Sequence, residues 1–100
     1  MRRVIVTNRA DAEFMRAIQR YNEKVPGLGD RFRLTIFSAF DQIAGRPESF
    51  PRITGEIRRA VIQVFPFVVH FQVEGDQIVI LSVFHTSRNP AVLRRRGIKL

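Results

Sequence analysis

The residues with the clearest chemical potential in this sequence are a histidine and the arginines around it. His85 can act as a general acid or base, because an unperturbed imidazole titrates near neutral pH. Arg88 follows it closely, and Arg58 and Arg59 stand side by side earlier in the chain. Guanidinium groups bind carboxylate and phosphate oxygens in a bidentate manner. The sequence therefore predicts an anion-binding site, with His85, Arg59 and Arg88 as the catalytic candidates if phosphate chemistry takes place there.

The second histidine and the absence of cysteine limit the other kinds of chemistry. His70 falls on a strand pattern and is expected to be a tolerated polar residue on a half-open face of a sheet. Two histidines without a cluster of carboxylates do not make a metal site, and without cysteine there is neither a thiolate ligand nor a disulfide. We therefore expect no metal and no cofactor.

The charge balance points to an anionic partner. Lys and Arg total 17 against 9 Asp and Glu, a net charge of +8, and all but two of the cations are arginine. Such a surface suits nucleic acid or an acidic protein segment, and charge alone does not distinguish them. The chain of 100 residues predicts a single domain over residues 1–100. Since no apolar run is long enough for a membrane span or a secretory signal, we expect a cytoplasmic protein without a membrane partner.

Hydrophobic periodicity predicts an α+β fold. A short β-branched strand opens the chain, and Asn8 is the expected cap of the helix that follows. A second helix follows a Pro-Gly turn, and the pattern then changes from helical to alternating. The expected order is an N-terminal strand, a helical hairpin and an antiparallel sheet of three further strands, over residues 3–7, 8–25, 30–44, 56–64, 67–74 and 77–84, with a turn-rich connection at 45–54.

A tight turn at Gly75-Asp76 predicts the pairing of the last two strands. The expected pairs are Val73 with Ile78, Phe71 with Ile80, Val69 with Ser82 and Phe67 with Phe84. One face of this pair then covers the helices, and the other face is partly open.

The second helix carries more apolar residues than one buried face requires. Leu34 and Phe37 fall outside its main apolar stripe. A helix that is apolar on most sides is buried on two sides or binds a partner.

The order of several short motifs resembles the RelE/ParE superfamily, the toxin halves of bacterial type II toxin–antitoxin pairs, and more closely its ParE branch. The resemblance extends over nearly the whole chain. The motifs that carry it are the helix over residues 12–21, Pro26-Gly27-Leu28-Gly29 with Phe32, Pro47, Phe50-Pro51, Gly55-Glu56-Ile57-Arg58-Arg59, Phe65-Pro66-Phe67, Gly75-Asp76 before Ile78-Val79-Ile80, and His85-Thr86-Ser87-Arg88-Asn89-Pro90 with Arg95 or Arg96 beyond.

This resemblance implies a toxin that inhibits growth and is held inactive in a hetero-oligomer with a cognate acidic antitoxin, the arrangement of plasmid-stabilisation systems. An antitoxin of this kind would place an apolar stripe against exposed helix residues and carboxylates on the arginines. The residues expected to bind it are Leu34, Phe37, Arg58, Arg59 and Arg88. Because neighbouring strand residues point to opposite faces, we expect one of Arg58 and Arg59 to be functional and the other structural.

The resemblance leaves the toxin's target open between two actions. ParE-like members inhibit DNA gyrase without known catalysis, whereas RelE-like members cleave mRNA on the ribosome without metal. The lone tyrosine, Tyr21, lies on the core side of its helix, and His85 lacks an obvious proton-transfer partner, so gyrase is the favoured target. Arg94, Arg95 and Arg96 are the expected target-binding residues. The alternatives are an mRNA endoribonuclease, with the ribosome and mRNA as partners, and a non-toxic nucleic-acid-binding module.

Overall fold

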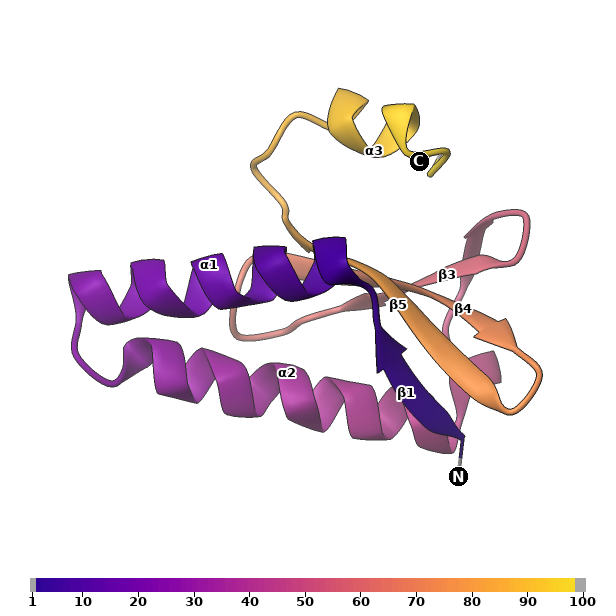
Figure 1. The fold of residues 1–100 in the computed structure, drawn as a ribbon, viewed down its shortest axis with the longest axis horizontal. Coiled ribbons are helices and arrows are strands. Elements are labelled where there is room, and N and C mark those ends of the chain that lie inside the picture. The colour runs from indigo at the N-terminus through magenta and orange to yellow at the C-terminus, as the bar shows by residue number, and fades with distance from the viewer. Residues whose placement is uncertain (1, 99–100) are drawn as a thin grey trace.

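A five-stranded mixed sheet with helices on both faces forms the body of the protein (Figure 1). The computed structural model describes residues 2–98; Lys99, part of the basic tail, lies outside the described residues. The strand order is β1-β5-β4-β3-β2. The elements are β1 (Arg3–Val6), α1 (Asn8–Lys24), α2 (Leu28–Gly45), a short 3₁₀ turn (Pro47–Ser49), β2 (Arg52–Thr54), β3 (Ile57–Val61), β4 (Phe67–Glu74), β5 (Gln77–His85) and α3 (Ala91–Arg95).

Helices α1 and α2 form the expected hairpin, which packs on one face of the sheet. The capping residue differs from the expectation: the Thr7 hydroxyl accepts a hydrogen bond from the Ala10 amide at 3.2 Å, and Asn8 is already the first helical residue. Thr7 takes this position because it immediately follows β1 and keeps extended backbone angles. The second helix begins at Leu28, two residues earlier than expected.

An aromatic cluster joins the hairpin to the sheet. Phe32 of α2 is fully buried, and its ring centroid lies 4.7 Å from that of Phe67 on β4. Tyr21 of α1 packs against both rings, at 5.3 Å from Phe32 and 6.2 Å from Phe67. Paired aromatic rings at these distances add to the stabilisation from burial alone. The cluster therefore fixes the far end of the hairpin against β4.

The sheet contains two pairings that the expected topology lacked. β1 lies parallel to β5, with Val4 opposite Ile78, so the sheet is mixed. The segment expected to be an irregular connection contains β2, which pairs antiparallel with β3. The fold class of α+β is confirmed.

A β-bulge in β5 changes the expected register. Phe71 pairs with Ile80 as expected, but His70 pairs with Ser82 and Val69 with Val83, so Leu81 is the extra residue. The expected pairs of Val69 with Ser82 and Phe67 with Phe84 are therefore wrong. An extra residue reverses the faces of every residue that follows it in the strand. Val83 consequently joins the core under the hairpin, whereas Phe84 turns to the opposite face.

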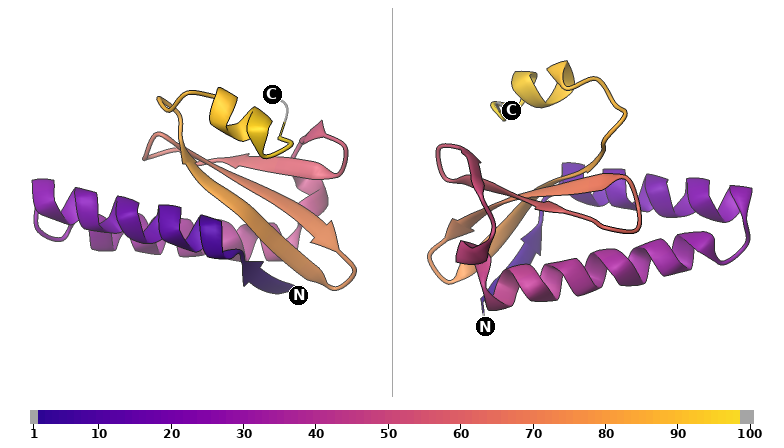
Figure 2. Two further views of the ribbon diagram at one scale, coloured as in Figure 1. Left: turned by 45° about the horizontal axis from the view of Figure 1, so that its top comes forward. Right: turned by 180° about the vertical axis from the view of Figure 1, so that it is seen from behind.

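That opposite face is covered by α3, so the expectation of a half-open face is wrong around His70. The view from behind shows α3 on the side of the sheet away from the hairpin (Figure 2). Leu93 and Ile98 are almost fully buried against Phe84, with Ile57 packed beside them. His70 is only 1% exposed. Within residues 2–98, no helix is long and apolar enough to cross a membrane.

A close contact at Gly29 fixes the turn between α1 and α2 and generates a stability prediction. A Cβ atom at Gly29 would lie 2.1 Å from the Ile18 carbonyl oxygen, and the Gly29 amide donates a 2.7 Å hydrogen bond to Asn22 Oδ1. Gly29→Ala must force the helices apart, and we expect it to lower the free energy of unfolding by about 1–3 kcal/mol in urea titrations. Gly45→Ala is the matched control, because a Cβ there meets nothing within 4 Å. Equal stability of the two variants would contradict the close packing.

Candidate functional site

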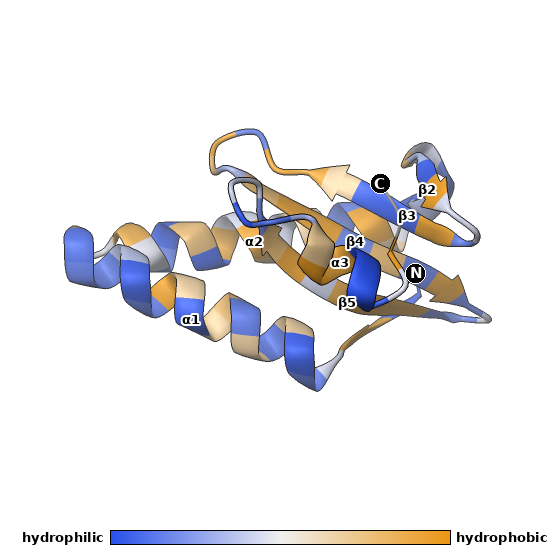
Figure 3. Cartoon of the chain, turned by 90° about the horizontal axis from the view of Figure 1, so that it is seen from above, coloured by the Kyte–Doolittle hydropathy of each residue, from blue (hydrophilic) through white to orange (hydrophobic). Residues whose placement is uncertain are grey.

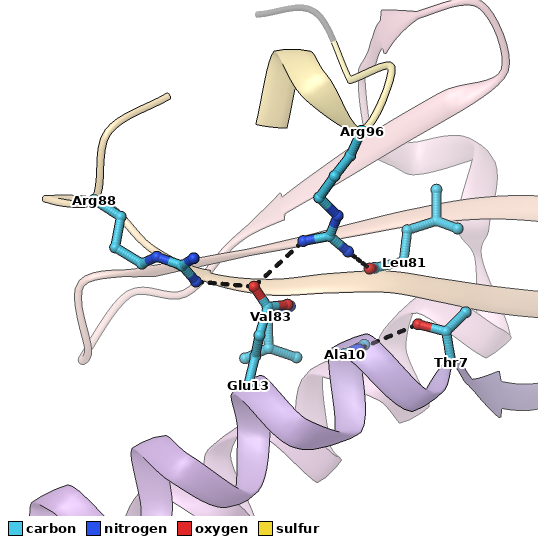
Figure 4. A network of polar contacts seen from close by, with 7 residues as sticks. All are labelled: Thr7, Ala10, Glu13, Leu81, Val83, Arg88 and Arg96. Atoms are coloured by element: carbon cyan, nitrogen blue, oxygen red, sulfur yellow. Dashed lines mark hydrogen bonds and ion pairs between the residues drawn. The ribbon is translucent and has the colours of Figure 1, made fainter. Parts of the chain in front are cut away.

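The most connected polar group in the described chain is the carboxylate of Glu13 on α1 (Figure 4). It is 8% exposed. Its Oε2 accepts hydrogen bonds from Arg88 at 2.9 Å and Arg96 at 3.3 Å, and its Oε1 accepts one from the Val83 amide at 3.2 Å. One carboxylate therefore joins α1, β5, the segment after β5 and the end of α3.

The need for this carboxylate follows from the shortness of β1. β1 ends at Val6, so β5 has no strand neighbour on that side beyond Ile80. The Val83 amide instead donates to Glu13, and the Leu81 carbonyl accepts from Arg96. Buried backbone groups need hydrogen-bond partners. Two side chains thus replace the missing strand along the bulged part of β5.

The Arg88 side chain contacts buried residues and is also partly exposed to solvent. Its guanidinium carbon lies 4.8 Å from the ring centroid of Phe84, in addition to its ion pair with Glu13. The side chain remains 40% exposed. Arg88 can therefore contact an anion from outside while it is held in place from within.

The three tail arginines expected to bind a target, Arg94, Arg95 and Arg96, differ in their exposure to solvent. Arg96 is 11% exposed at its side chain and is bound to Glu13. Burial lowers the pKa of Arg96, and the adjacent Glu13 charge counteracts that effect. Arg94 and Arg95 are exposed at the end of α3. Of these three arginines, Arg94 and Arg95 are the two with no side-chain ion pair to any residue of the range 2–98.

Arg58 and Arg59 divide as the alternation of strand residues predicted. Arg58 donates a 2.6 Å hydrogen bond to the Phe50 carbonyl and is half-buried. Arg59 is exposed opposite His70 on the face that carries α3. Arg58 thus has a structural contact, and Arg59 is the one available to a ligand.

The apolar residues expected at the antitoxin surface are exposed on α2. Leu34 is 64% exposed and Phe37 is 47% exposed. The edge of the Phe37 ring packs on Phe14, with ring centroids 5.5 Å apart. The two side chains lie one turn apart on the helix and form an apolar surface that the rest of the described chain leaves uncovered.

His85 lies in a groove between α1 and the end of β5. Its Nδ1 is 3.0 Å from the Ser87 amide nitrogen and 2.8 Å from the Ser87 hydroxyl. Its ring packs edge-on against Phe67, at 5.0 Å between centroids. Tyr21, Arg20 and Lys24 line the same hollow. The bulge in β5 places His85 here, because it turns residues after Leu81 to the other face.

Sequence reasoning missed both Glu13 and the cations of α1. The stripe Arg9, Arg16, Arg20 and Lys24 follows steps of seven, four and four residues, which place these side chains along one side of a helix. That spacing could have predicted a row of cations along the helix. Glu13 gave no such signal, because its partners are 70 or more residues away in the sequence.

His70 occupies an unusual position under α3. Both its ring nitrogens, and the hydroxyl of Ser82 opposite it, are buried without a hydrogen-bond partner among the described residues. Burial, assisted by the charges of Arg96 and Arg59, lowers the pKa of His70 to about 4. No group of three metal-ligating side chains occurs within residues 2–98.

The buried carboxylate generates a prediction about stability. Glu13→Gln keeps an acceptor for the Val83 amide but leaves Arg88 and Arg96 without a counter-charge, so we expect a loss of roughly 2–4 kcal/mol in the free energy of unfolding. Glu23→Gln on the same helix removes an exposed carboxylate and is expected to change stability by less than about 0.5 kcal/mol. Urea titration of both variants with the parent chain measures the difference. A loss no larger than that of the control would show that the cluster is not structural.

The lowered pKa of His70 predicts acid sensitivity with a defined window. Below about pH 6.5 the unfolded chain takes up a proton at His70 that the folded chain excludes down to about pH 4. This contribution to stability is therefore complete above pH 6.5 and is lost as the pH falls towards 4. His70→Phe should remove the loss, so the variant should gain roughly 2 kcal/mol on the parent between pH 7.5 and 4.5, as measured by denaturant unfolding. Parallel pH profiles of the two chains would contradict it.

Comparisons with known proteins agree with this architecture. Among curated proteins, no match to the chain is found. A solved structure described as the chromosomal ParDE TA system from P. aeruginosa superimposes with a TM-score of 0.77 at 19% sequence identity, covering 87% of this chain and 98% of that one. The family model described as ParE toxin of type II toxin-antitoxin system, parDE, matches residues 4–90. The chain therefore belongs to the ParE toxin family of type II toxin–antitoxin systems.

Proposed function

We propose that this protein inhibits growth by acting on DNA gyrase and that a cognate acidic antitoxin neutralises it. The observation that carries the proposal is the match of residues 4–90 to the ParE toxin family. The surface of the molecule supports an acidic partner, since the net charge is +8 and exposed apolar residues lie on α2. An antitoxin complex combines burial of such residues with neutralisation of nearby cations.

The positions of the expected binding residues favour an antitoxin that wraps around the toxin. Leu34 and Phe37 lie on α2, on one side of the sheet, whereas Arg59 faces the side that carries α3. Arg88 follows β5 and is partly exposed. A single rigid helix does not reach both sides of a sheet. An extended acidic segment with an apolar anchor for α2 fits this distribution of residues.

The chemistry of the groove favours gyrase over mRNA cleavage. General acid–base cleavage of RNA needs a proton donor and a proton acceptor near the phosphate. The Nδ1 atom of His85 is engaged with Ser87, and burial raises the pKa of Tyr21, which makes its phenol a poorer proton donor. The groups around His85 are thus poorly suited to proton transfer. Inhibition of gyrase by binding needs no proton-transfer groups.

Two assays on the purified chain test the target. We expect the chain to block DNA supercoiling by gyrase, or to trap gyrase–DNA cleavage products, while a defined message on translating ribosomes stays intact. His85→Ala should leave the gyrase effect within about twofold, because binding does not depend on proton transfer at this residue. Codon-phased cuts in the message with normal supercoiling would overturn the proposal in favour of the endoribonuclease. Unaffected growth on expression would favour the non-toxic module.

The exposed apolar pair on α2 generates a prediction about the antitoxin. The chain is co-expressed with the small acidic protein encoded beside it, and the affinity of the purified pair is measured by calorimetry. Leu34→Ser with Phe37→Ser should weaken the complex at least about 30-fold, because apolar anchors of this kind contribute about 2 kcal/mol or more. Val61→Ser with Val64→Ser is the matched control, since both valines are exposed outside α2, Val61 at the end of β3 and Val64 in the segment before β4. Equal weakening by the two double variants would show that α2 is not the anchor surface.

A further inference from the structure

A continuous cationic groove runs along α1 on the side that faces the end of β5 and α3. Three adjoining hollows share lining residues: Arg20 and His85 line the first two, and Glu13 and Arg16 line the second and third. The view in Figure 3 shows hydrophilic residues recurring along α1 and on α3. The cations that line the groove are Arg9, Arg16, Arg20 and Lys24 from α1, Arg88 from the segment after β5, and Arg95 and Arg96 from α3.

The positive charge of this groove is not compensated within the described chain. Among residues 2–98, Glu13 is the one carboxylate that lines the groove, and it is already bound to Arg88 and Arg96. The four cations of α1 form no ion pair with any residue of the described range 2–98. Uncompensated cations that line a hollow attract and hold an anionic ligand.

The spacing of the cations suits a chain of evenly spaced negative charges. Arg16, Arg20 and Lys24 follow one another at four-residue steps, about 6 Å apart along the helix axis at a rise of 1.5 Å per residue. From Arg9 to Lys24 the stripe is about 22 Å long by the same rise. The ligand that matches it is an extended polyanion and not a single small anion.

Rings line the floor of the groove at its Lys24 end. Tyr21 and His85 are half-buried and line the same hollow as Lys24, and Phe67 lies beneath them. The ring of His85 is fixed by its contact with Phe67. Aromatic side chains beside a cationic groove bind unpaired bases by stacking. Bases inside a duplex are not accessible to such rings.

The groove does not offer what an amphipathic acidic helix requires. In the described part of the chain, the exposed large apolar side chains are Ile5, Met15, Val25, Leu34, Phe37, Val61 and Val64, and none of them lines the groove. The apolar anchor for a protein partner therefore lies on α2, away from these cations. We propose that the groove along α1 binds single-stranded nucleic acid, through phosphate contacts to Arg16, Arg20 and Lys24 and base stacking at His85 and Tyr21. This property goes beyond the proposed action on gyrase and the proposed antitoxin complex.

The test uses the purified full chain without antitoxin or gyrase. A fluorescein-labelled oligomer of 12 thymidines is titrated with protein, and binding is followed by anisotropy between 50 and 200 mM NaCl. Each phosphate contact to a single strand contributes about −0.7 to the slope of log affinity against log salt. We expect a slope near −2 for the three α1 cations. A uridine oligomer should bind similarly, because the phosphate chain is common to both.

Two double variants that each remove two positive charges separate a specific groove from general attraction. Arg16→Gln with Arg20→Gln should weaken binding at least about tenfold and make the salt slope shallower by about 1.4. Arg31→Gln with Arg33→Gln removes the same charge from exposed positions on α2 and should change affinity by less than about threefold. Circular dichroism and thermal melting confirm that both variants fold. Equal losses in the two double variants would overturn the proposal, since they would show that only net charge matters.

Three further measurements address the occupant. His85→Ala should weaken binding of the oligomer severalfold without a change in salt slope, because it removes stacking and no phosphate contact. Equal affinity for a duplex of the same length would overturn the single-strand assignment. Displacement of the oligomer by a polyglutamate peptide at equal charge concentration would show that the groove takes acidic protein instead. Failure of any of these leaves the gyrase and antitoxin assays unaffected, because those assays have different readouts.

Discussion

The architecture depends on how the protein supplies hydrogen-bond partners to the backbone of β5 where this strand extends beyond its neighbour β1. β1 stops at Val6, whereas β5 runs on to His85. Buried amide and carbonyl groups without partners cost about 1–3 kcal/mol each. Glu13 and Arg96 satisfy the exposed edge of β5 and also neutralise each other. A single ion pair thus serves two purposes, closing the sheet and attaching the C-terminal helix.

The bulge at Leu81 follows from the same arrangement and determines which side chains reach the groove. It turns Val83 into the main core, Phe84 into the smaller core under α3, and His85 towards α1. Without the extra residue, Ser82 and Phe84 would face the helices as their alternation implies. The bulge therefore determines which residues of β5 enter each core and that His85 lines the groove. Bulges beside functional surfaces commonly have this effect on side-chain direction.

The local sequence pattern was sufficient to predict the order of α1, α2, β3, β4 and β5, because the spacing of apolar residues is characteristic of each of these elements. The spacing also separated Arg58 from Arg59 and indicated that Leu34 and Phe37 are exposed. It did not identify the partners of Glu13, since a hydrogen bond across 70 residues leaves no local trace. The bulge at Leu81 could not be predicted for the same reason. The alternation of apolar and polar residues in β5 looks regular in the sequence, and the groups that bind the edge of the strand come from distant residues. His70 was placed on an open face because the covering helix α3 is only five residues long.

The parallel pairing of β1 with β5 also matters during synthesis of the chain. β1 emerges from the ribosome well before its partner β5, since Arg3 pairs with Gln77. Long-range pairings of this kind form late, after the entropy of closing a large loop has been overcome. Since the ribosome makes the N-terminal part first, the growing chain has no completed sheet until β5 has been synthesised. The surfaces that need the complete sheet consequently arise only after β5 has been made, although α1 and α2 are synthesised long before it.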